Sequence, residues 1–309
     1  MYYSPLRYPG GKRKLASFME YMIDKLGHRG GTYIEPFAGG AGIAIELLER
    51  NVVENIVIND YDKGVWSFWK AVLTDTDKMV EMIEHVPLTM DEWKKQRCIV
   101  SNSNNYRRYS FELGFATFFM NRTNRSGIIK GGVIGGLEQS GKWKLDVRFN
   151  KCELIRRIRN IAKRKRHIRL YNKDIGSFIK NILPRCTDNA FVYFDPPYFG
   201  KGKQLYMNYF SYDDHFEIEQ LIRNYVNVDW IITYDVAPEI IKIYERYPSC
   251  LYDLNYSVSK KCKNSEMMIF KKYENVPDNN QLLERGIVIN LRKQLEQYNQ
   301  CIEDNFWNY

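Results

Sequence analysis

The chain has 309 residues, 44% of them hydrophobic, and its 46 lysines and arginines against 37 acids give a net charge of +9. Such a chain can bury a sizeable core, and it contains no run of about 18 apolar residues that would predict a membrane-spanning helix. The opening MYYSPLRYPGGKRK lacks the apolar stretch of a secretory signal, and six scattered cysteines form no C-x-x-C pair. These features predict a cytoplasmic protein with reduced thiols and no metal site. The excess of basic residues favours a polyanionic partner, nucleic acid more than an acidic membrane surface. The alternative is that the charge serves only general solubility.

The N-terminal part predicts a βαβ unit. Segment 12–26 places six apolar residues on one face of a helix: Leu15, Phe18, Met19, Met22, Ile23 and Leu26. Gly30 and Gly31 then break the chain before a short strand that starts at Thr32. The loop EPFAGGAG, a helix over 43–50 and a strand over 55–60 follow.

The pattern changes after residue 62 and the βα rhythm returns later. Helical stretches run to about residue 120, a glycine-dense stretch predicts loops and hairpins, and Asn150 is a suitable N-cap for a further helix. Four later strands are expected at residues 168–171, 191–194, 229–233 and 266–270. We therefore predict an α/β, Rossmann-like doubly wound sheet with an inserted, mainly helical domain. The expected divisions are a sheet domain over 1–62 and 165–275, an insertion over 63–164 and a helical tail over 276–309.

The tail carries apolar residues at heptad-like spacing: Val288, Leu291, Leu295, Tyr298 and Ile302. Such spacing is more often a helix packed on its own domain than a dimer seam, so we expect a monomer or a weak dimer.

The glycine loop predicts a ligand site. In a doubly wound sheet, ligands bind at the carboxyl ends of the strands, and glycines allow the backbone to approach them closely. Asp60, at the end of the next strand, is positioned to accept hydrogen bonds from two ribose hydroxyls. Ile45 stands where a dinucleotide site has its third glycine, and no P-loop lysine follows. A nucleoside with a zwitterionic tail, such as S-adenosylmethionine, fits better, and the alternative is a tight structural turn.

A second site is expected in FVYFDPPYFG, where a strand runs into Asp195, Pro196, Pro197 and Tyr198. Each proline removes an N–H, which leaves carbonyl oxygens as acceptors beside the Asp195 carboxylate. Tyr198 adds a flat face, so the motif suits a planar ring with an amino group, such as adenine. Acceptors on both amino hydrogens favour the tetrahedral nitrogen of a transition state over the planar ground state. The alternative is a proline-rich turn.

These motifs together resemble the DNA adenine-N6 methyltransferases of the alpha group, the Dam-like family. The likeness rests on PLRYPGGKRKL, YIEPFAGGAG, the Asn59-Asp60 strand end, FFMNRTNRSGI and FDPPY, in that order. It implies a site-specific enzyme that transfers a methyl group from S-adenosylmethionine to adenine N6 in double-stranded DNA. It also implies that the insertion is the target recognition domain. Related glutamine and cytosine-N4 enzymes typically begin the last motif with Asn or Ser, so Asp195 favours adenine.

The resemblance also implies a role for each motif residue. The catalytic residues are Asp195, Pro196, Pro197 and Tyr198. Lys12 is expected to face the methionine carboxylate of the cofactor, Asp60 its ribose and Asp174 its adenine. The full set of expected cofactor contacts is Tyr8, Gly10, Gly11, Lys12, Glu35, Pro36, Phe37, Gly39, Gly40, Asp60, Asp174 and Asp195.

A target adenine inside a duplex must be flipped out of the stack, so the protein also needs DNA contacts. We expect them from FFMNRTNRSGI and from the basic segment 151–169, whose apolar stripe should turn its charge outward. The expected residues are Asn121, Arg122, Asn124, Arg125, Arg157, Arg164 and Arg166. Segment 199–213 is long for a strand-to-helix loop and is either a lid over the flipped base or a surface loop.

Three functions remain open from the sequence. The first is a site-specific adenine methyltransferase, either solitary or the partner of a restriction nuclease. The second is an RNA or other amino-group methyltransferase. The third is a non-catalytic DNA-binding relative, against which the intact motif residues argue.

Overall fold

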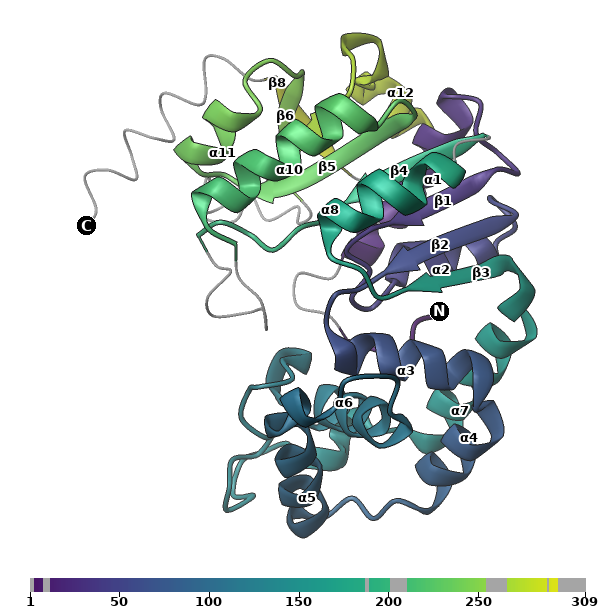
Figure 1. Cartoon of the computed structure of the whole chain (residues 1–309), viewed down its shortest axis with the longest axis vertical. Coiled ribbons are helices and arrows are strands. Elements are labelled where there is room, and N and C mark those ends of the chain that lie inside the picture. The colour runs from purple at the N-terminus through teal and green to yellow at the C-terminus, as the bar shows by residue number, and fades with distance from the viewer. Residues whose placement is uncertain are drawn as a thin grey trace.

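The computed structural model describes residues 3–7, 12–186, 189–200, 210–253, 266–287 and 289–293. Its centre is one eight-stranded sheet with the order β3-β2-β1-β4-β5-β7-β6-β8 (Figure 1). The first five strands are parallel, and β6, β7 and β8 extend the sheet in antiparallel pairs. The strands are β1 (Thr32–Glu35), β2 (Asn55–Asn59), β3 (Ile168–Tyr171), β4 (Ala190–Phe194), β5 (Asp229–Asp235), β6 (Ser249–Asp253), β7 (Glu266–Phe270) and β8 (Asn290–Lys293).

The strand order reverses between β1 and β4, which lie side by side although the chain visits β2 and β3 between them. Ile34 pairs with Val192 in a parallel register, so β1 and β4 end at the same edge of the sheet. A reversal of this kind leaves a crevice at the carboxyl ends of the two strands. The glycine loop and the DPPY motif both leave the sheet at this crevice.

Both faces of the sheet are covered, because alternate side chains of each strand are buried on opposite sides. Tyr33 and Phe191 pack with η1 (Lys12–Leu15), α1 (Ala16–Lys25) and α2 (Gly42–Glu49). Ile34 and Val192 pack into a second core with the helices of the other face. Those helices are α8 (Ile175–Ser177), η6 (Phe178–Ile182), η7 (Leu183–Arg185), α10 (Tyr212–Tyr225) and α11 (Pro238–Ile243).

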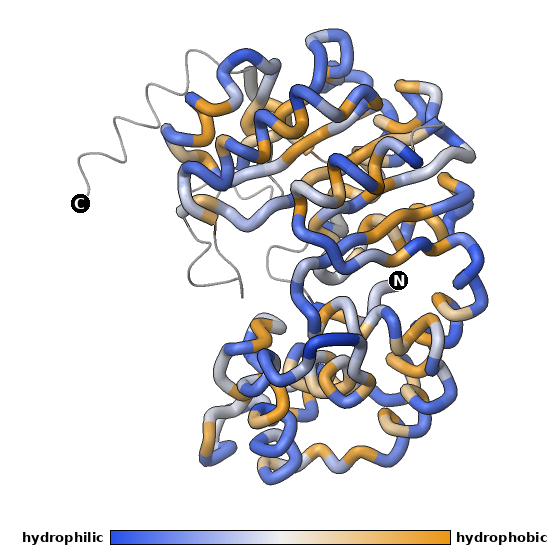
Figure 2. Tube along the Cα trace, in the orientation of Figure 1, coloured by the Kyte–Doolittle hydropathy of each residue, from blue (hydrophilic) through white to orange (hydrophobic). Residues whose placement is uncertain are grey.

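A helical layer lies between β2 and β3 in the sequence and beside the sheet in space, in the lower half of Figure 1. Its helix α6 is buried from Leu113 to Thr123 and forms the centre of the layer. Figure 2 shows hydrophobic residues along the strands and hydrophilic residues on the outer turns of these helices. The helices are α3 (Lys63–Thr74), α4 (Thr76–His85), α5 (Met90–Ser101), α6 (Phe111–Thr123) and α7 (Lys151–Lys163), with short turns η2 (Ser103–Asn105), η3 (Arg125–Gly127), η4 (Leu145–Arg148) and η5 (Lys165–His167).

The predicted α/β sheet and its strands are confirmed, and so is the N-cap at Asn150, whose Oδ1 accepts the Glu153 N–H at 3.0 Å. The helical tail is wrong at 290–293, because β8 lies there and puts Leu291 opposite Tyr252 of β6. Pairing with β8 satisfies backbone groups that β6 would otherwise leave open at the sheet edge. Ahead of β8, the tail contains η8 (Tyr273–Asn275) and α12 (Asn279–Glu284). Val288, Leu295, Tyr298 and Ile302 lie outside the described residues.

No helix within the described ranges is long and apolar enough to cross a membrane. The division into two domains and the role of residues 63–164 in DNA recognition stay predictions.

The helical layer depends on a close approach of α3 and α6, and we predict that Gly114→Ala destabilises the protein. A Cβ at Gly114 would lie 2.6 Å from the Ser67 carbonyl carbon and 2.7 Å from the Phe68 nitrogen, both of them backbone atoms. Such overpacking costs about 1–3 kcal/mol, more than the gain in helix propensity of about 1 kcal/mol. Urea unfolding measures the effect, with Gly132→Ala as the control, because a Cβ at Gly132 meets no atom within 4 Å. Equal midpoints for the two variants would contradict the close packing.

Candidate active site

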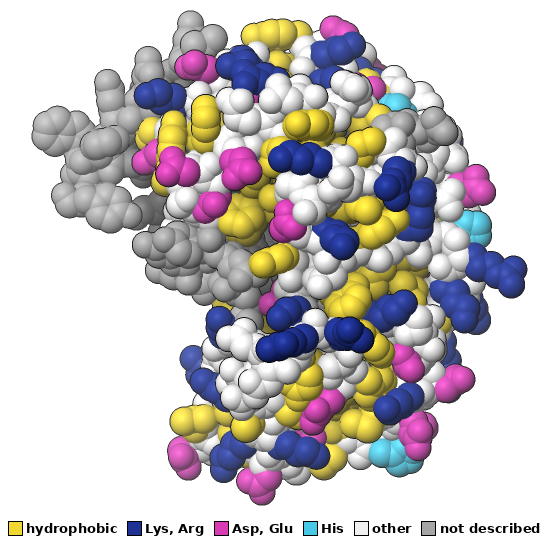
Figure 3. Space-filling model, in the orientation of Figure 1, with side chains coloured by type: hydrophobic (Ala, Val, Ile, Leu, Met, Phe, Trp, Pro, Cys, Tyr) yellow, Lys and Arg dark blue, Asp and Glu magenta, His cyan; other side chains and the backbone are white. Residues whose placement is uncertain are grey.

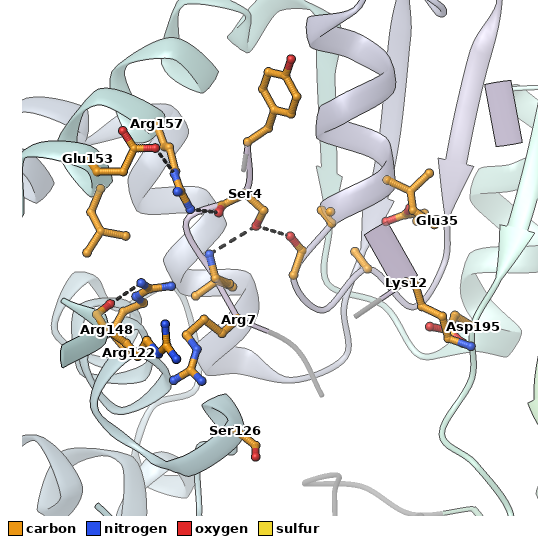
Figure 4. A pocket seen from close by; sticks show the side chains of 18 of the residues that line it. Ser4, Arg7, Lys12, Glu35, Arg122, Ser126, Arg148, Glu153, Arg157 and Asp195 are labelled. Carbon is orange, nitrogen blue, oxygen red and sulfur yellow. Dashed lines mark hydrogen bonds and ion pairs between the residues drawn. The ribbon is translucent and has the colours of Figure 1, made fainter. Parts of the chain in front are cut away.

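A cavity of about 570 Å³ lies at the crevice between β1 and β4 and extends toward the helical layer (Figure 4). It brings together four parts of the chain that are far apart in the sequence: the N-terminal residues before α1, the glycine loop after β1, the end of β4, and residues 122–157 of the helical layer. Residues that line it include Ser4, Arg7, Lys12, Glu35, Phe37, Gly40, Arg122, Arg148 and Asp195. Figure 4 shows Arg7, Arg122 and Arg148 grouped apart from Lys12 and Asp195. The cavity therefore has a strongly basic part and a part that contains the motif acid.

The glycine loop is held in a fixed conformation. Gly39 and Ala41 have φ angles of 47° and 44°, in the left-handed region that favours glycine. Asp60 accepts the Gly39 N–H at 2.8 Å, and the Trp69 indole donates to the Gly39 carbonyl at 2.9 Å. Gly42 begins α2 and lines the cavity, and a Cβ there would meet no protein atom within 4 Å. The loop thus leaves open space beside its backbone, as a bound ligand requires.

Two acids flank this loop, the buried Glu35 and the half-buried Asp60. Glu35 is 5% exposed and accepts the Ala44 N–H at 3.2 Å, and burial raises its pKa to about 8. Asp60 also accepts the Asp62 N–H at 2.8 Å, and burial, followed by the charge of Asp62, raises its pKa to about 7. Acids in such surroundings suit a ligand with a positive charge and hydroxyl groups, because the positive charge favours their ionised form, whereas a triphosphate would disfavour it. These acceptors fit S-adenosylmethionine, which carries ammonium, sulfonium and ribose groups.

The loop after β3 lies beside the loop after β2. Asn59 joins them, because its Nδ2 donates to the Lys173 carbonyl at 3.0 Å and its Oδ1 accepts the Lys173 N–H at 2.9 Å. Asp174 then caps α8 by accepting the Ser177 N–H at 2.8 Å, and this hydrogen bond lowers its pKa. Pro36 and Gly39 belong to the glycine loop, and Asp60 and Asp174 follow β2 and β3, but none of these four residues lines the cavity itself. Tyr8, Gly10 and Gly11 lie outside the described residues.

The end of β4 places Asp195 in a polar network. Its Oδ1 accepts the Thr233 hydroxyl at 2.9 Å and lies 3.4 Å from the Lys12 ammonium. Burial raises the pKa of Asp195, and the charge of Lys12 opposes this shift. Pro196 is buried and Pro197 half-buried, while Tyr198 is 7% exposed and its hydroxyl accepts a hydrogen bond from Lys12. Asp195 and Tyr198 are therefore fixed by Thr233 of β5 and by Lys12 of η1.

Lys12 lines the cavity as expected, but its ammonium is already engaged. It lies 2.6 Å from Glu266 and 3.0 Å from the Tyr252 hydroxyl, in addition to its contact with Asp195. Sequence reasoning missed Thr233, Tyr252 and Glu266. Glu266 stands directly before the apolar run MMIF, and an acid at the start of a strand could have been recognised as a candidate site residue. Nothing in the sequence, however, puts β7 beside β5. Across the described residues, no group of three or more His, Cys, Asp or Glu side chains is arranged to hold a metal ion.

A model of the D12 class N6 adenine-specific DNA methyltransferases matches residues 8–257. The chain belongs to this family. Its activity is the methylation of adenine N6 in DNA, and the family implies S-adenosylmethionine as the donor.

Two curated relatives are type II methyltransferases. M.MjaIII of Methanocaldococcus jannaschii is 26% identical over 221 residues, which cover 67% of this chain and 73% of that protein. M1.LlaDCHI of Lactococcus lactis subsp. cremoris is 23% identical over 229 residues, which cover 70% and 75%. Among solved structures, the rRNA methyltransferase aviRa of Streptomyces viridochromogenes is 11% identical, with a TM-score of 0.39 and coverage of 85% and 86%. The family assignment does not depend on this last likeness.

The expected DNA contacts of this D12-class protein need correction at Asn121 and Asn124. Asn121 is 1% exposed; its Oδ1 accepts the Arg7 N–H at 2.7 Å, and its Nδ2 donates to the Arg7 carbonyl at 2.6 Å. Asn124 is 0% exposed; it accepts the Trp93 indole N–H at 2.8 Å and donates to the Ile128 and Ile129 carbonyls. Both amides satisfy buried loop and side-chain groups, so neither is available to DNA.

Arg157 and Arg164 also differ from expectation. Arg157 donates to the Ser4 carbonyl at 3.0 Å and to Glu153 at 2.9 Å, and Arg164 donates to the Leu48 carbonyl at 3.1 Å. Both arginines therefore tie α7 and the turn after it to the sheet layer. The apolar stripe of α7 is buried as predicted, but the loops beside the helix draw these two side chains inward.

Arg125 and Arg166 are exposed. Arg122 is 9% exposed, and burial together with the charges of Arg7, Arg157 and Arg148 lowers its pKa to about 9. Its guanidinium donates to the Pro5 and Arg148 carbonyls, while its Nε has no hydrogen-bond partner among the residues that the structure describes. Figure 3 shows further Lys and Arg side chains along the neck between the sheet and the helical layer.

We predict opposite effects of Glu35→Gln on stability and on ligand binding. The folded pKa of Glu35 is above its ordinary value of 4.5, so ionisation favours the unfolded chain and wild type loses stability as the pH rises from 4.5 toward 8. The glutamine variant is expected to be more stable by about 1–3 kcal/mol at pH 9, and no different at pH 4. It should bind S-adenosylhomocysteine more weakly, because a carboxylate partner is lost.

Urea unfolding at the two pH values and calorimetry with S-adenosylhomocysteine measure these effects, with the exposed Glu54→Gln as the control. A variant that is destabilised at pH 9 would contradict the raised pKa of Glu35. A variant that binds the ligand as wild type does would contradict its role in ligand binding.

Proposed function

We propose that this chain methylates the N6 amine of a flipped-out adenine at a specific site in double-stranded DNA, with S-adenosylmethionine as the donor. The observation that carries the proposal is the single cavity shared by the glycine loop and Asp195. A donor held by the loop and an amine held by Asp195 would meet there, which supplies the proximity that methyl transfer needs.

The residues of the first half of the sheet would hold the donor. Glu35 suits the ammonium of the methionine part, Asp60 the ribose hydroxyls, and Asp174 the amino group of the adenine ring. Bound in this way, S-adenosylmethionine supplies a methyl group on a sulfonium. The remaining expected donor contacts are Tyr8, Gly10, Gly11, Pro36, Phe37, Gly39 and Gly40.

Asp195 and the Pro196 carbonyl would hold the target amine. Oδ1 of Asp195 is engaged by Thr233, and among the described residues its Oδ2 has no hydrogen bond. Oδ2 and the Pro196 oxygen can therefore accept the two amino hydrogens, which favours the tetrahedral nitrogen over the planar one. The new N–C bond forms as the S–C bond breaks, and the amine proton then leaves toward Asp195.

Tyr198 would stack on the flipped base, and such stacking contributes about 1–3 kcal/mol per base. Its ring is 7% exposed in this conformation. A base can use the ring face only if the residues that cover it move when the duplex binds. Base flipping and this opening would then be coupled steps.

The proposed DNA contacts are Arg122, Arg125 and Arg166. Arg122 lines the cavity beside Arg7 and Arg148, which suits a phosphate next to the flipped nucleotide. The type II names of the two relatives support a restriction nuclease as a biological partner, and a solitary enzyme is the alternative. We propose a monomer or a weak dimer as the acting unit.

Incubation with labelled S-adenosylmethionine and genomic DNA tests the proposed function directly. Nucleoside analysis should find N6-methyladenine, and methylation-aware sequencing should find it in one short motif. Label on cytosine, on RNA only, or on no nucleic acid would contradict the proposal.

We predict that Asp195→Ala abolishes methyl transfer but leaves the binding of S-adenosylhomocysteine close to that of wild type. The substitution removes both carboxylate oxygens, including the proposed acceptor of the amine hydrogens. By analogy with oxyanion-hole donors, the loss of one transition-state contact costs about 3 kcal/mol or more. Methylation assays and calorimetry measure the two effects. Near wild-type turnover would reject the catalytic role of Asp195.

The two neighbouring arginines Arg164 and Arg166 give a matched test of the DNA surface. Arg166→Gln should weaken binding to all duplexes alike and reduce the slope of log affinity against log salt by about 1. Arg164→Gln should leave that slope unchanged, because its side chain is bound to the sheet layer. Fluorescence anisotropy over a salt series measures both slopes, and the reverse ranking would contradict this assignment.

A further inference from the structure

One cation stands at the centre of a polar cluster formed at the ends of four strands. The cluster consists of Lys12, Asp195, Tyr198, Thr233, Tyr252 and Glu266. The Lys12 ammonium lies 2.6 Å from Glu266, 3.0 Å from the Tyr252 hydroxyl and 3.4 Å from Asp195. The Tyr252 hydroxyl donates in turn to Glu266, on the same oxygen that Lys12 contacts. The side chains of Lys12, Asp195 and Glu266 are 13%, 23% and 18% exposed, so water screens the charges only in part.

Lys12 touches both polar side chains of the DPPY motif. It lies 3.4 Å from Oδ1 of Asp195 and donates to the hydroxyl of Tyr198. Thr233 also donates to Oδ1 of Asp195, at 2.9 Å, and lies 2.7 Å from the Tyr193 hydroxyl. These contacts fix one oxygen of Asp195, Oδ1. The position of Lys12 therefore sets the relative position of the acceptor and the ring.

Glu266 decides how strongly Lys12 binds Asp195. Its carboxylate is the nearer of the two, at 2.6 Å against 3.4 Å, and Tyr252 orients it. Without Glu266, the ammonium would turn to Asp195 and compete with the target amine for its oxygens. Without Lys12, two carboxylates would share a partly buried site, which favours protonation of one of them.

We propose that Lys12 and Glu266 are positioning residues of the methylation reaction: their ion pair aligns Asp195 with Tyr198 and keeps Asp195 ionised but available to the target amine. This inference rests on the proposed function for the identity of the amine. It gives Lys12 a role different from binding the cofactor carboxylate, and it assigns a role to Glu266.

Within the part of the chain that the structure describes, few other charged groups face Asp195. The titratable groups that surround it come from every neighbouring strand and are Tyr33, Glu35, Tyr193, Tyr198, Tyr234, Tyr252 and Glu266, together with Lys12. The tyrosines are neutral, because burial raises each of their pKa values. Glu35, with a pKa of about 8, is mostly neutral at pH 7. Lys12 and Glu266 therefore dominate the charge around Asp195, and burial is the opposing effect.

The test uses Lys12→Met, Glu266→Gln and the double variant, in which both charges are absent. The first readout is the pKa of the Asp195 carboxyl in the cofactor-free protein, followed by carbon-13 NMR of labelled aspartate and assigned with Asp195→Asn. Lys12→Met should raise this pKa by about 1 unit or more, and Glu266→Gln should lower it, because an opposite and a like charge are removed. The double variant should return close to the wild-type value, since both opposing charges are gone.

The second readout is the pH dependence of methylation. Activity requires ionised Asp195 and falls as the pH drops through its pKa. The acidic limb should therefore move to higher pH in Lys12→Met and to lower pH in Glu266→Gln. The binding of S-adenosylhomocysteine by Glu266→Gln should equal that of wild type. Lys94→Met, at an exposed residue of α5, is the matched control for the lysine substitution and should change none of these readouts.

Shifts of opposite sign in the single variants, with restoration in the double variant, support the proposal. No shift, shifts of one sign, or a double variant that behaves like either single one would overturn it. The NMR readout does not depend on the substrate, so it tests the effect of Lys12 and Glu266 on Asp195 even if wild type fails to methylate adenine. That failure would reject the proposed function and not this inference. If Lys12→Met does not fold, Lys12→Gln takes its place.

Discussion

The parallel pairing of β1 with β4 is the constraint on which the site depends. Ile34 lies opposite Val192, so two loops that are far apart in the sequence leave the sheet at one edge. One loop carries the glycines and Glu35, and the other carries Asp195. A slip of this register would separate the two halves of the cavity, and it would also exchange the side chains buried on the two faces of the sheet. The apolar cores on both faces therefore fix the geometry of the site.

The fold tolerates acids that are unfavourable for its own stability. Burial raises the pKa values of Glu35, Asp60 and Asp195, which means that each prefers to be neutral in the folded protein. Such groups are typical of functional sites, where a ligand supplies the missing charge partner. Of these three acids, Asp195 is the one that lies near Lys12, and Lys12 also forms an ion pair with Glu266. Asp195 is therefore suited to accept the target amine, while Glu35 and Asp60 are suited to bind the methyl donor.

Much of the fold and the two central motifs could be predicted from the sequence because they are local patterns. The helix over 12–25 follows from apolar spacing, the strand before Asp195 from a buried apolar run, and the glycine loop from its composition. The edge strand β8 could not be predicted, because it depends on pairing with β6 rather than on its own residues. The sequence contains no signal for that pairing.

The DNA-facing residues were harder to predict for the same reason. Asn121 and Asn124 look like base-reading side chains in FFMNRTNRSGI, but they satisfy buried backbone groups and the Trp93 indole. Arg164 belongs to a basic run, but a carbonyl at the end of α2 draws it inward. The Lys12 cluster joins residues from η1, β4, β5, β6 and β7, so only the folded sheet brings it together. Local sequence specifies side-chain chemistry, while tertiary contacts decide which groups remain free.

A crystal structure of the protein with S-adenosylhomocysteine is the most direct measurement of the central claim, that one cavity joins the donor site to Asp195. The account predicts the homocysteine part of the ligand in the 570 Å³ cavity, near Glu35, with its sulfur directed toward Asp195. It also predicts that Lys12 remains paired with Glu266 in that complex. A ligand bound outside the cavity, or one whose sulfur points away from Asp195, would contradict the account.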